Sequence, residues 1–367
     1  MSNKNSEAIV VLGAGPSGAV AAALLAQAGR AVTLVDEQTK VNFKVGETLP
    51  ADGAMALARA GISQVCKHIP TLPCSANRSF WGSEILQMRS SLTNPYGCGA
   101  HLDRVAFDAA LINRAISAGA VFKPGTRLRS TVRNKHGWSL HFRSAQGSFR
   151  RDSGWVLDAT GRRAAFAQAQ GAKRLVTDKL VAVIGVLCSL EFADPDLTIS
   201  IESAPDGWWY SAQIPSSGRI VIYFTDGDIL KYSGAREERA WFQLASETQL
   251  IREFTNNPAY LLKFPLKVAL ADTSRLDCAA ADGWLAIGDS ARAIDPLSSA
   301  GITDAIKSAI DAVQVVLESK PGDKTTISDY ASRVTRQHIR NNHLRSRYYH
   351  MERRWPRSEF WVRRHAR

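Results

Sequence analysis

The sequence predicts an α/β fold with a parallel sheet, an inserted β-rich domain and a helical C-terminal tail. Three observations predict it. A Gly-rich turn lies between two short apolar strands near the start of the chain, and two later strands end in Asp-Ala-Thr-Gly and Gly-Asp. Strand-like runs dominate residues 180–226, and helical spacing returns from Ser290 to Leu317. A nucleotide-binding sheet that is interrupted in sequence by a β-rich insert accounts for this order.

The first βαβ unit carries the strongest signal. An apolar strand runs into a G-x-G-x-x-G turn, an Ala-rich helix follows, and a second strand ends at Asp36. Gly13 allows the tight turn, Gly15 lets the backbone approach a pyrophosphate, and Gly18 lets the helix pack closely on the strand. The helix N-terminus offers free N–H groups to phosphate, and Asp36 is placed to bind a ribose. The residues predicted to hold the dinucleotide here are Gly13, Gly15, Pro16, Ser17, Gly18 and Asp36.

Composition narrows the class of protein. The chain has 367 residues, 45% of them apolar, which is enough for two joined domains. Its five cysteines are odd in number and lack C-x-x-C spacing, which argues against a disulfide framework or a metal site and for a reducing compartment. The polar N-terminus and the glycine-interrupted apolar run predict neither a signal peptide nor a membrane span. We therefore expect a cytoplasmic protein with no membrane partner.

The C-terminal tail carries most of the net charge of +12. Within residues 336–367, ten arginines stand against Glu352 and Glu359 and supply +8 of it, and five aromatic residues are interleaved with them. Three readings compete: nucleic-acid binding, a helix that packs its aromatic residues on the body, and docking of an acidic protein partner. No recognised nucleic-acid module accompanies the tail, so we expect no nucleic acid. The arginines are Arg336, Arg340, Arg345, Arg347, Arg353, Arg354, Arg357, Arg363, Arg364 and Arg367.

The domain organisation follows from these patterns. We expect a discontinuous nucleotide-binding domain, a β-rich substrate domain and a basic helical tail. The expected ranges are 1–70, 100–170 and 271–320 for the first domain, 71–99 and 171–270 for the second, and 321–367 for the tail.

Two later motifs complete a family pattern. Val156-Leu157-Asp158-Ala159-Thr160-Gly161 and Trp284-Leu285-Ala286-Ile287-Gly288-Asp289 each end a strand, and the second precedes Asp295-Pro296-Leu297-Ser298-Ser299. With the first turn, over roughly residues 7–320, they resemble the flavoprotein monooxygenases of the aromatic hydroxylase type and the related flavin-dependent halogenases.

The resemblance implies FAD as the cofactor in a Rossmann-like domain. Asp289 would bind the ribityl or pyrophosphate part, and backbone N–H groups of the loop 296–302 would face the isoalloxazine edge. An N-cap role for Asp289 and a turn-forming role for Asp158 stay open. Further cofactor-binding residues implied are Glu47, Thr48, Arg104, Asp158, Gly161, Pro296, Gly301 and Ile302.

The branch of the superfamily is indicated by departures from the halogenase pattern. The segment Lys44–Pro50 resembles a K-V-G-E-S/T-L-P segment that halogenases share with some monooxygenases. Halogenases also place a lysine about thirty residues later and carry W-x-W-x-I-P. Here residues 73–80 contain no lysine, and Tyr210 replaces the second tryptophan.

A narrower resemblance covers residues 205–211, 295–299 and the tail. These stretches look most like flavoprotein maturases that oxygenate a tryptophan of a partner protein during cysteine tryptophylquinone formation. Ala300 departs from that pattern, in which Gln often precedes the Gly. The resemblance implies a protein substrate that docks near the basic aromatic tail.

The chemistry implied is monooxygenation. Reduced flavin and O₂ give a C4a-hydroperoxide, whose distal oxygen is transferred to an electron-rich indole or phenol ring. No second dinucleotide motif is present, so electrons must come from transiently bound NAD(P)H or from a flavin reductase. Trp208, Trp209 and Tyr210 are the candidate substrate wall, although adjacent tryptophans on a strand face opposite ways. Glu47 and Asp295 are candidate proton shuttles, with ordinary loop polarity as the alternative.

Other functions remain open from the residues alone. A halogenase or hydroxylase of a small indole or phenol is one, and a flavoprotein that reduces lipid alkenes is another. A protein that binds a partner and keeps FAD only structurally is the non-enzymatic alternative.

Overall fold

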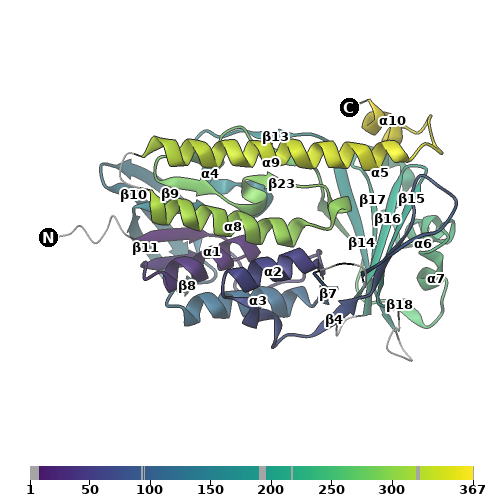
Figure 1. Cartoon of the computed structure of the whole chain (residues 1–367), viewed down its shortest axis with the longest axis horizontal. Helices are drawn as coiled ribbons and strands as arrows, with labels where there is room; N and C mark the ends of the chain where they lie inside the picture. The colour runs from purple at the N-terminus through teal and green to yellow at the C-terminus, as the bar shows by residue number, and fades with distance from the viewer. Residues whose placement is uncertain are drawn as a thin grey trace.

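The computed structural model describes residues 8–91, 94, 96–189, 196–215, 218–319 and 323–366. A lobe with a mostly parallel sheet and a lobe with a mostly antiparallel sheet lie side by side. The long helix α9 (Lys324–Met351) runs along both lobes (Figure 1).

The first lobe is built on a six-stranded sheet in the order β21-β22-β12-β1-β2-β8. All neighbours except β21 and β22 are parallel. Strand β1 is buried throughout, as expected for an apolar run in a sheet covered on both faces. Because parallel strands end at one edge, the segments after β1, β12 and β22 meet there. The strands are β1 (Ile9–Leu12), β2 (Val32–Val35), β8 (Val121–Lys123), β12 (Trp155–Asp158), β21 (Ala280–Ala281) and β22 (Trp284–Ala286).

Helices and a β-meander complete this lobe. Helix α1 (Pro16–Gln27) packs against α3 (Arg104–Ser117) and α8 (Gly301–Glu318). The meander β9–β11 places Trp138 and Leu140 in the same core. The remaining elements are α2 (Ala51–Arg59), η1 (Ser63–Cys66), η3 (Gly161–Arg163), α4 (Ala165–Ala169), η4 (Gly288–Ser290), η5 (Pro296–Ser298), β9 (Arg127–Asn134), β10 (Gly137–Ser144) and β11 (Gly147–Ser153).

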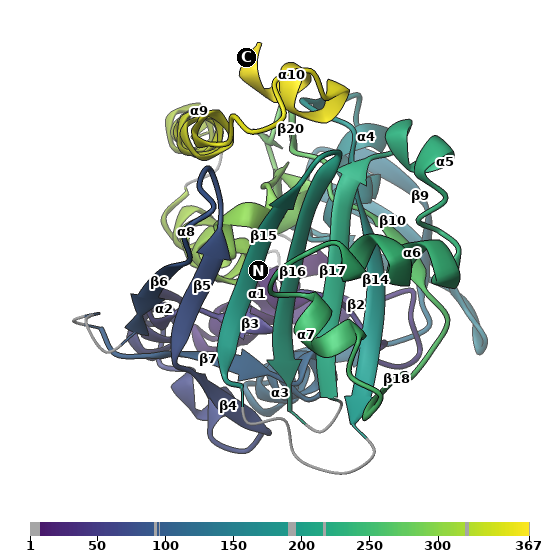
Figure 2. The ribbon, with the colours of Figure 1, turned by 90° about the vertical axis from the view of Figure 1, so that its right-hand side faces the viewer.

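The second lobe is an eight-stranded sheet in the order β18-β14-β17-β16-β15-β5-β6, with β19 also paired to β14. Its pairs are antiparallel except β15 with β5. Helices α6 and α7 cover one face (Figure 2). The elements are β5 (Ala76–Phe80), β6 (Gln87–Ser90), β14 (Leu180–Ser189), β15 (Thr198–Ala204), β16 (Gly207–Ile214), β17 (Gly218–Asp226), α5 (Ile229–Ser233), α6 (Glu238–Ser246), α7 (Arg252–Thr255), β18 (Tyr260–Leu262) and β19 (Lys267–Leu270).

Two three-stranded sheets lie where the lobes meet. One has the order β3-β7-β4 and the other β13-β20-β23. The strands are β3 (Thr48–Leu49), β4 (Thr71–Cys74), β7 (Gly99–Leu102), β13 (Arg174–Val176), β20 (Ser274–Leu276) and β23 (Arg292–Ala293).

The predicted fold class is confirmed, with a parallel Rossmann-like sheet, a separate antiparallel sheet and C-terminal helices. The helix expected from Ser290 instead begins at Gly301. Residues 292–293 pair with β20 as strand β23, and Asp295 caps the short turn η5, so the intervening segment cannot be helical.

The C-terminal tail is part of both cores. Helix α9 buries Tyr330 and Val334 in the first lobe and Tyr349 in the second. Helix α10 (Glu359–His365) buries Phe360 and Trp361 against the second sheet.

The tail arginines divide into two groups. Four of them pair with acids of the chain, in the pairs Arg345–Asp178, Arg354–Glu352, Arg363–Asp228 and Arg364–Asp226. Five are exposed, namely Arg336, Arg340, Arg347, Arg353 and Arg357, and Arg367 lies outside the described residues.

The five cysteines are free thiols. In the described ranges, we find no helix that combines the length and the apolar character needed to cross a membrane.

Replacing Trp361 should destabilise the whole chain. Its ring is fully buried, and its Nε1 donates to the carbonyl oxygen of Ala204 at 2.9 Å. We expect Trp361→Ala to lower the free energy of unfolding by about 3–5 kcal/mol. The neighbouring exposed Val362→Ala should change it by less than about 0.5 kcal/mol. Urea denaturation of both variants checks this, and equal effects would contradict the packing described.

Candidate active site

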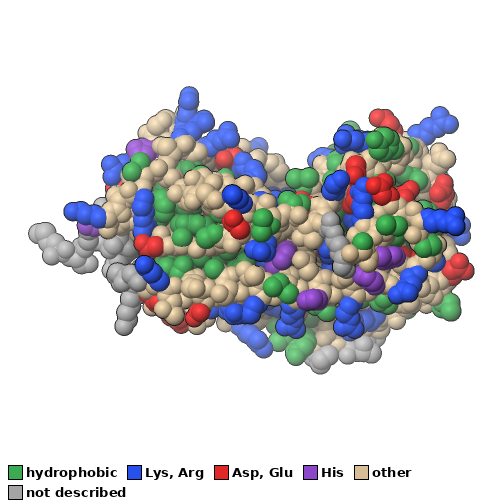
Figure 3. All heavy atoms as spheres, turned by 90° about the horizontal axis from the view of Figure 1, so that it is seen from above, with side chains coloured by type: hydrophobic (Ala, Val, Ile, Leu, Met, Phe, Trp, Pro, Cys, Tyr) green, Lys and Arg blue, Asp and Glu red, His purple; other side chains and the backbone are tan. Residues whose placement is uncertain are grey.

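A single cavity of about 1000 Å³ lies between the lobes, and it is lined by both. This is the upper end of the range of about 300–1,000 Å³ usual for ligand pockets. Figure 3 shows the surface hollowed between the two lobes. The predicted site residues that line the cavity are Gly13, Gly15, Pro16, Ser17, Asp36, Glu47, Thr48, Arg104, Gly161, Tyr210, Asp289, Asp295, Pro296, Gly301 and Ile302.

The three glycines of the first turn have different surroundings. Gly13 has a φ of +100°, and a Cβ there would lie 2.2 Å from the carbonyl oxygen of Ala159. A Cβ on Gly18 would lie 1.9 Å from the carbonyl oxygen of Gly13. Gly15 lines the cavity, and a Cβ there would meet no atom within 4 Å. Gly13 and Gly18 therefore serve packing, whereas the space beside Gly15 is available to a ligand.

Two helix N-termini face the cavity without side-chain caps. The first intrahelical bond of α1 runs from Ala19 N–H to the carbonyl oxygen of Gly15, which leaves the preceding N–H groups open. Helix α8 likewise begins at Gly301 after Ala300, which offers no capping side chain. Both positive dipole ends thus meet one cavity. This arrangement fits a pyrophosphate at α1 and an electron-rich ring edge at α8, as FAD would supply.

Asp36 fastens the first turn to the end of β2. Its Oδ2 accepts from Ala14 N–H at 2.7 Å, and its Oδ1 accepts from Gln38 N–H at 2.7 Å. Each carboxylate oxygen retains a further lone pair, so a ribose hydroxyl can still donate to this group.

Arg104 holds the loop 43–48 in place. Its guanidinium donates to Asp108 at 3.1 and 3.2 Å and to the carbonyl oxygen of Val45 at 2.6 Å. Sequence reasoning missed Asp108, although its position four residues after Arg104 on one helix face is a usable signal.

Asp158 itself does not line the cavity, although the residues that follow it do. It is fully buried, and its carboxylate accepts from Thr160 N–H at 3.0 Å, Ala167 N–H at 2.8 Å and Ser290 Oγ at 3.2 Å. These bonds join the segments after β12 and β22, which fits the turn-forming role that was the alternative for Asp158. Gly18 is also a packing residue, for the reason given above.

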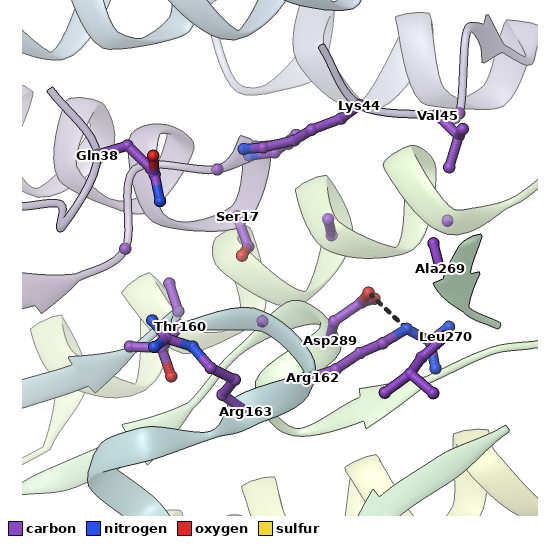
Figure 4. A pocket seen from close by; sticks show the side chains of 18 of the residues that line it. Ser17, Gln38, Lys44, Val45, Thr160, Arg162, Arg163, Ala269, Leu270 and Asp289 are labelled. Atoms are coloured by element: carbon purple, nitrogen blue, oxygen red, sulfur yellow. Dashed lines mark ion pairs between the residues drawn. The ribbon is translucent and has the colours of Figure 1, made fainter. Parts of the chain in front are cut away.

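Asp289 lies on the cavity wall in the turn η4, so the helix N-cap alternative does not apply. Its side chain is 46% exposed, and its Oδ2 lies 3.8 Å from Nε of Arg162 (Figure 4). Arg162 also pairs with Asp272 at 3.1 Å. Sequence reasoning missed Arg162, which directly follows the predicted Gly161.

A buried polar cluster lies where the loop 43–48 meets the second sheet. The hydroxyls of Thr48 and Tyr210 are 3.1 Å apart, and Thr48 Oγ1 lies 3.2 Å from Nδ1 of His101. Burial and the neighbouring Glu47, which is hydrogen-bonded to it, raise the pKa of Tyr210 well above its usual value. Burial lowers the pKa of His101. Tyr210 therefore stays protonated and able to donate, and sequence reasoning missed His101.

Asp295 joins the loop 296–302 to the C-terminal tail. Its Oδ1 accepts from Leu297 N–H at 2.9 Å, and its Oδ2 accepts from the Tyr349 hydroxyl at 3.1 Å. Trp208 Nε1 in turn donates to the Tyr349 hydroxyl at 3.1 Å. Burial, followed by the nearby charge of Asp178, raises the pKa of Asp295 to about 6.

Of the predicted substrate wall, Tyr210 alone lies against the cavity. Trp208 is fully buried and stacks on Phe224 with ring centroids 4.1 Å apart. Trp209 points to the opposite face, where it packs on Trp241. Both tryptophans are thus core residues, because strand alternation and the C-terminal segment decide their surroundings.

Gly15→Val should separate cofactor binding from folding. The side chain projects into open space, so we expect the apoprotein to fold normally but to retain less than roughly a tenth of the normal flavin, because the space is that of a pyrophosphate. Visible flavin absorbance per protein measures this. Gly18→Ala is the matched contrast and should destabilise the fold itself. Normal yellow occupancy in Gly15→Val would contradict the site.

Asp295→Asn should remove a pH dependence of stability. The folded-state pKa of about 6 lies above the usual aspartate value of 3.8, so protonation of Asp295 stabilises the fold below pH 3.8 and this contribution is lost as pH rises through 6. Between these limits wild type should lose up to about 3 kcal/mol relative to Asp295→Asn. Denaturation curves from pH 4 to 7.5 test it; parallel profiles would refute the assignment.

Comparison with known proteins agrees with this geometry. The family model described as FAD binding domain matches residues 6–334. The FAD-dependent oxidoreductase LodB of Marinomonas mediterranea is 27% identical over 97% of this chain and 96% of its own length.

Two solved structures share the fold. The myxobacterial chondrochloren halogenase CndH superposes with a TM-score of 0.87 at 18% identity, over 98% of this chain and 86% of that one. The peptidyl tryptophan dihydroxylase QhpG superposes with a TM-score of 0.79 at 24% identity, over 97% and 78% of the two chains. The predicted relation to the aromatic-hydroxylase and halogenase superfamily is confirmed. The chain belongs to the FAD binding domain family and is an FAD-dependent oxidoreductase.

Proposed function

We propose that this protein is a monooxygenase that hydroxylates an electron-rich aromatic ring, most specifically a tryptophan side chain of a partner protein. The observation that carries the proposal is the single cavity that runs from the first glycine turn to the apolar face of the second sheet. At the sheet end it is lined by Ala182, Ile184, Tyr210, Ile222 and Phe224. An apolar wall beside the α8 N-terminus suits a ring held next to the cofactor's reactive part. The protein acceptor is supported by the likeness to the peptidyl tryptophan dihydroxylase QhpG.

The bound cofactor would supply the oxygen chemistry: reduced FAD activates O₂, one oxygen atom enters the ring and the other leaves as water. The two electrons come from NAD(P)H or from a flavin reductase. Glu47 and Asp295 are both buried acids on the cavity wall. One of these carboxylates would accept the proton that the ring carbon loses when it takes up oxygen. The apolar sheet face excludes water and orients the ring.

The exposed tail arginines would favour an acidic acceptor. Arg336, Arg340 and Arg347 are exposed on α9, and no ion pair to them is found within the described ranges. Such charges raise the rate of encounter with a negatively charged partner and lose effect as salt is added.

Oxygen transfer to a peptide tests the proposal directly. Holoenzyme is reduced anaerobically and mixed with ¹⁸O₂ and a short blocked peptide that contains one tryptophan between glutamates. We expect the tryptophan to gain labelled oxygen, detected by mass spectrometry, at a rate that falls with added salt. Replacing the carboxylate that accepts the proton, by Glu47→Gln or by Asp295→Asn, should lower the rate by about 10²–10⁴-fold. The exposed Glu238→Gln on α6 is the control.

If the flavin is oxidised and free indoles gain labelled oxygen but the peptide does not, the proposal of a protein acceptor is overturned. No labelled product from any ring would overturn monooxygenation.

Halogenation is the second candidate, because two lysines outside residues 73–80, Lys44 and Lys267, line the cavity. The fold of the halogenase CndH is also similar. A product that contains bromine when the same reaction is run in bromide would support this candidate against hydroxylation.

A further inference from the structure

The second sheet ends in a free edge at the cavity. Strand β19 pairs with β14, which pairs on its other side with β17. Within the described ranges, β14 is the one strand partner of β19. The outer edge of β19 therefore presents unpaired backbone N–H and C=O groups, which are a template for another strand.

The pairing register identifies the groups on that edge. Ala271 N–H donates to the carbonyl oxygen of Leu180 at 3.0 Å, and the same register pairs Ala269 with Ala182. Hydrogen-bonded and non-hydrogen-bonded pairs alternate along an antiparallel ladder. Lys267, Ala269 and Ala271 thus bond to β14, whereas Val268 and Leu270 direct their backbone groups to the free edge.

This edge forms part of the cavity wall. Residues 267–271 all line the cavity, together with Phe43 of the facing loop. Figure 4 shows Ala269 and Leu270 on the same side of the cavity as Arg162 and Asp289. Ala269 also packs against the core that contains Tyr210. A strand added here would direct alternate side chains toward that apolar wall.

The side chains around the edge favour a polypeptide ligand. Val268 and Leu270 are 47% and 68% exposed, and Phe264 is 47% exposed. Edge strands are usually protected by charge, proline or a covering loop. Here Pro265 precedes the strand and Lys267 begins it, whereas Val268 and Leu270 remain exposed apolar residues beside the cavity. Lys263 and Lys267 are exposed at its start. They suit an acidic residue of the bound segment.

We propose that the free edge of β19 captures an extended, acidic segment of the protein acceptor as an added β-strand and so delivers its aromatic side chain into the cavity. The inference rests on the proposed function in that the acceptor is a polypeptide. Main-chain hydrogen bonds to Val268 and Leu270 give affinity, and the cavity selects the one side chain that enters it.

Backbone methylation of a peptide tests the pairing without altering the protein. The probe is a blocked peptide of alternating threonine and valine with a central tryptophan and a glutamate at each end. Its affinity for the oxidised holoenzyme is measured by calorimetry. We expect N-methylation at alternate positions near the tryptophan to weaken binding about tenfold and at intervening positions to leave it unchanged. A flat or non-alternating pattern would overturn the proposal.

Two further measurements address the protein side. Residue-resolved hydrogen exchange should show new protection of the Val268 and Leu270 amides on peptide binding, while the Ala269 amide, bonded to β14, is unaffected. Leu270→Pro removes one outward N–H and should weaken the peptide about tenfold, whereas Leu270→Ala keeps that N–H and should weaken it less. Equal losses in the two variants would count against edge pairing.

The outcomes separate this inference from the proposed function. Labelled tryptophan without the alternating methylation pattern would leave the oxygenation standing and overturn the edge. The alternating pattern without labelled product would support the edge and overturn the acceptor chemistry. If light scattering finds a dimer of the holoenzyme that Leu270→Pro dissociates, the edge pairs with a second copy of the chain and the proposal fails.

Discussion

A buried hydrogen-bonded chain, Trp208 to Tyr349 to Asp295, joins three parts of the molecule that are far apart in sequence. Trp208 belongs to the second sheet, Tyr349 to α9 and Asp295 to the loop before α8. Because α9 also buries Tyr330 in the first core, its position is set by both lobes at once. Helix α9 therefore packs on both lobes that enclose the cavity. The apolar sheet face and the two helix N-termini can therefore act on one ligand.

The position of the tail on both lobes is also fixed by buried ion pairs. Glu352 is fully buried and accepts from Gly82 N–H at 2.9 Å as well as from Arg354. Arg364 of α10 pairs with Asp226 of β17 at 2.8 Å. Breaking one partner of such a buried pair leaves an uncompensated charge, so these contacts fix one geometry for the tail.

The sequence was informative where structure depends on local rules. The glycine turn and the turns that follow β12 and β22 depend on backbone sterics, and strand and helix spacing was enough for the fold class. It was less informative where partners are distant. Whether Trp208 or Tyr210 lines the cavity depends on residues more than a hundred positions away, and the same holds for Arg345 and its partner Asp178. The helix expected at Ser290 failed because pairing with β20 overrode local propensity.

The order of synthesis determines when the contact between Tyr349 and Asp295 can form. Every residue that lines the cavity precedes Tyr349, Phe360 and Trp361 in the chain, and translation proceeds from the N-terminus. A nascent polypeptide can thus complete its glycine turn and parallel sheet while the Asp295 carboxyl still lacks its phenolic partner. The buried chain through Tyr349 can therefore close only after every residue that lines the cavity has been synthesised.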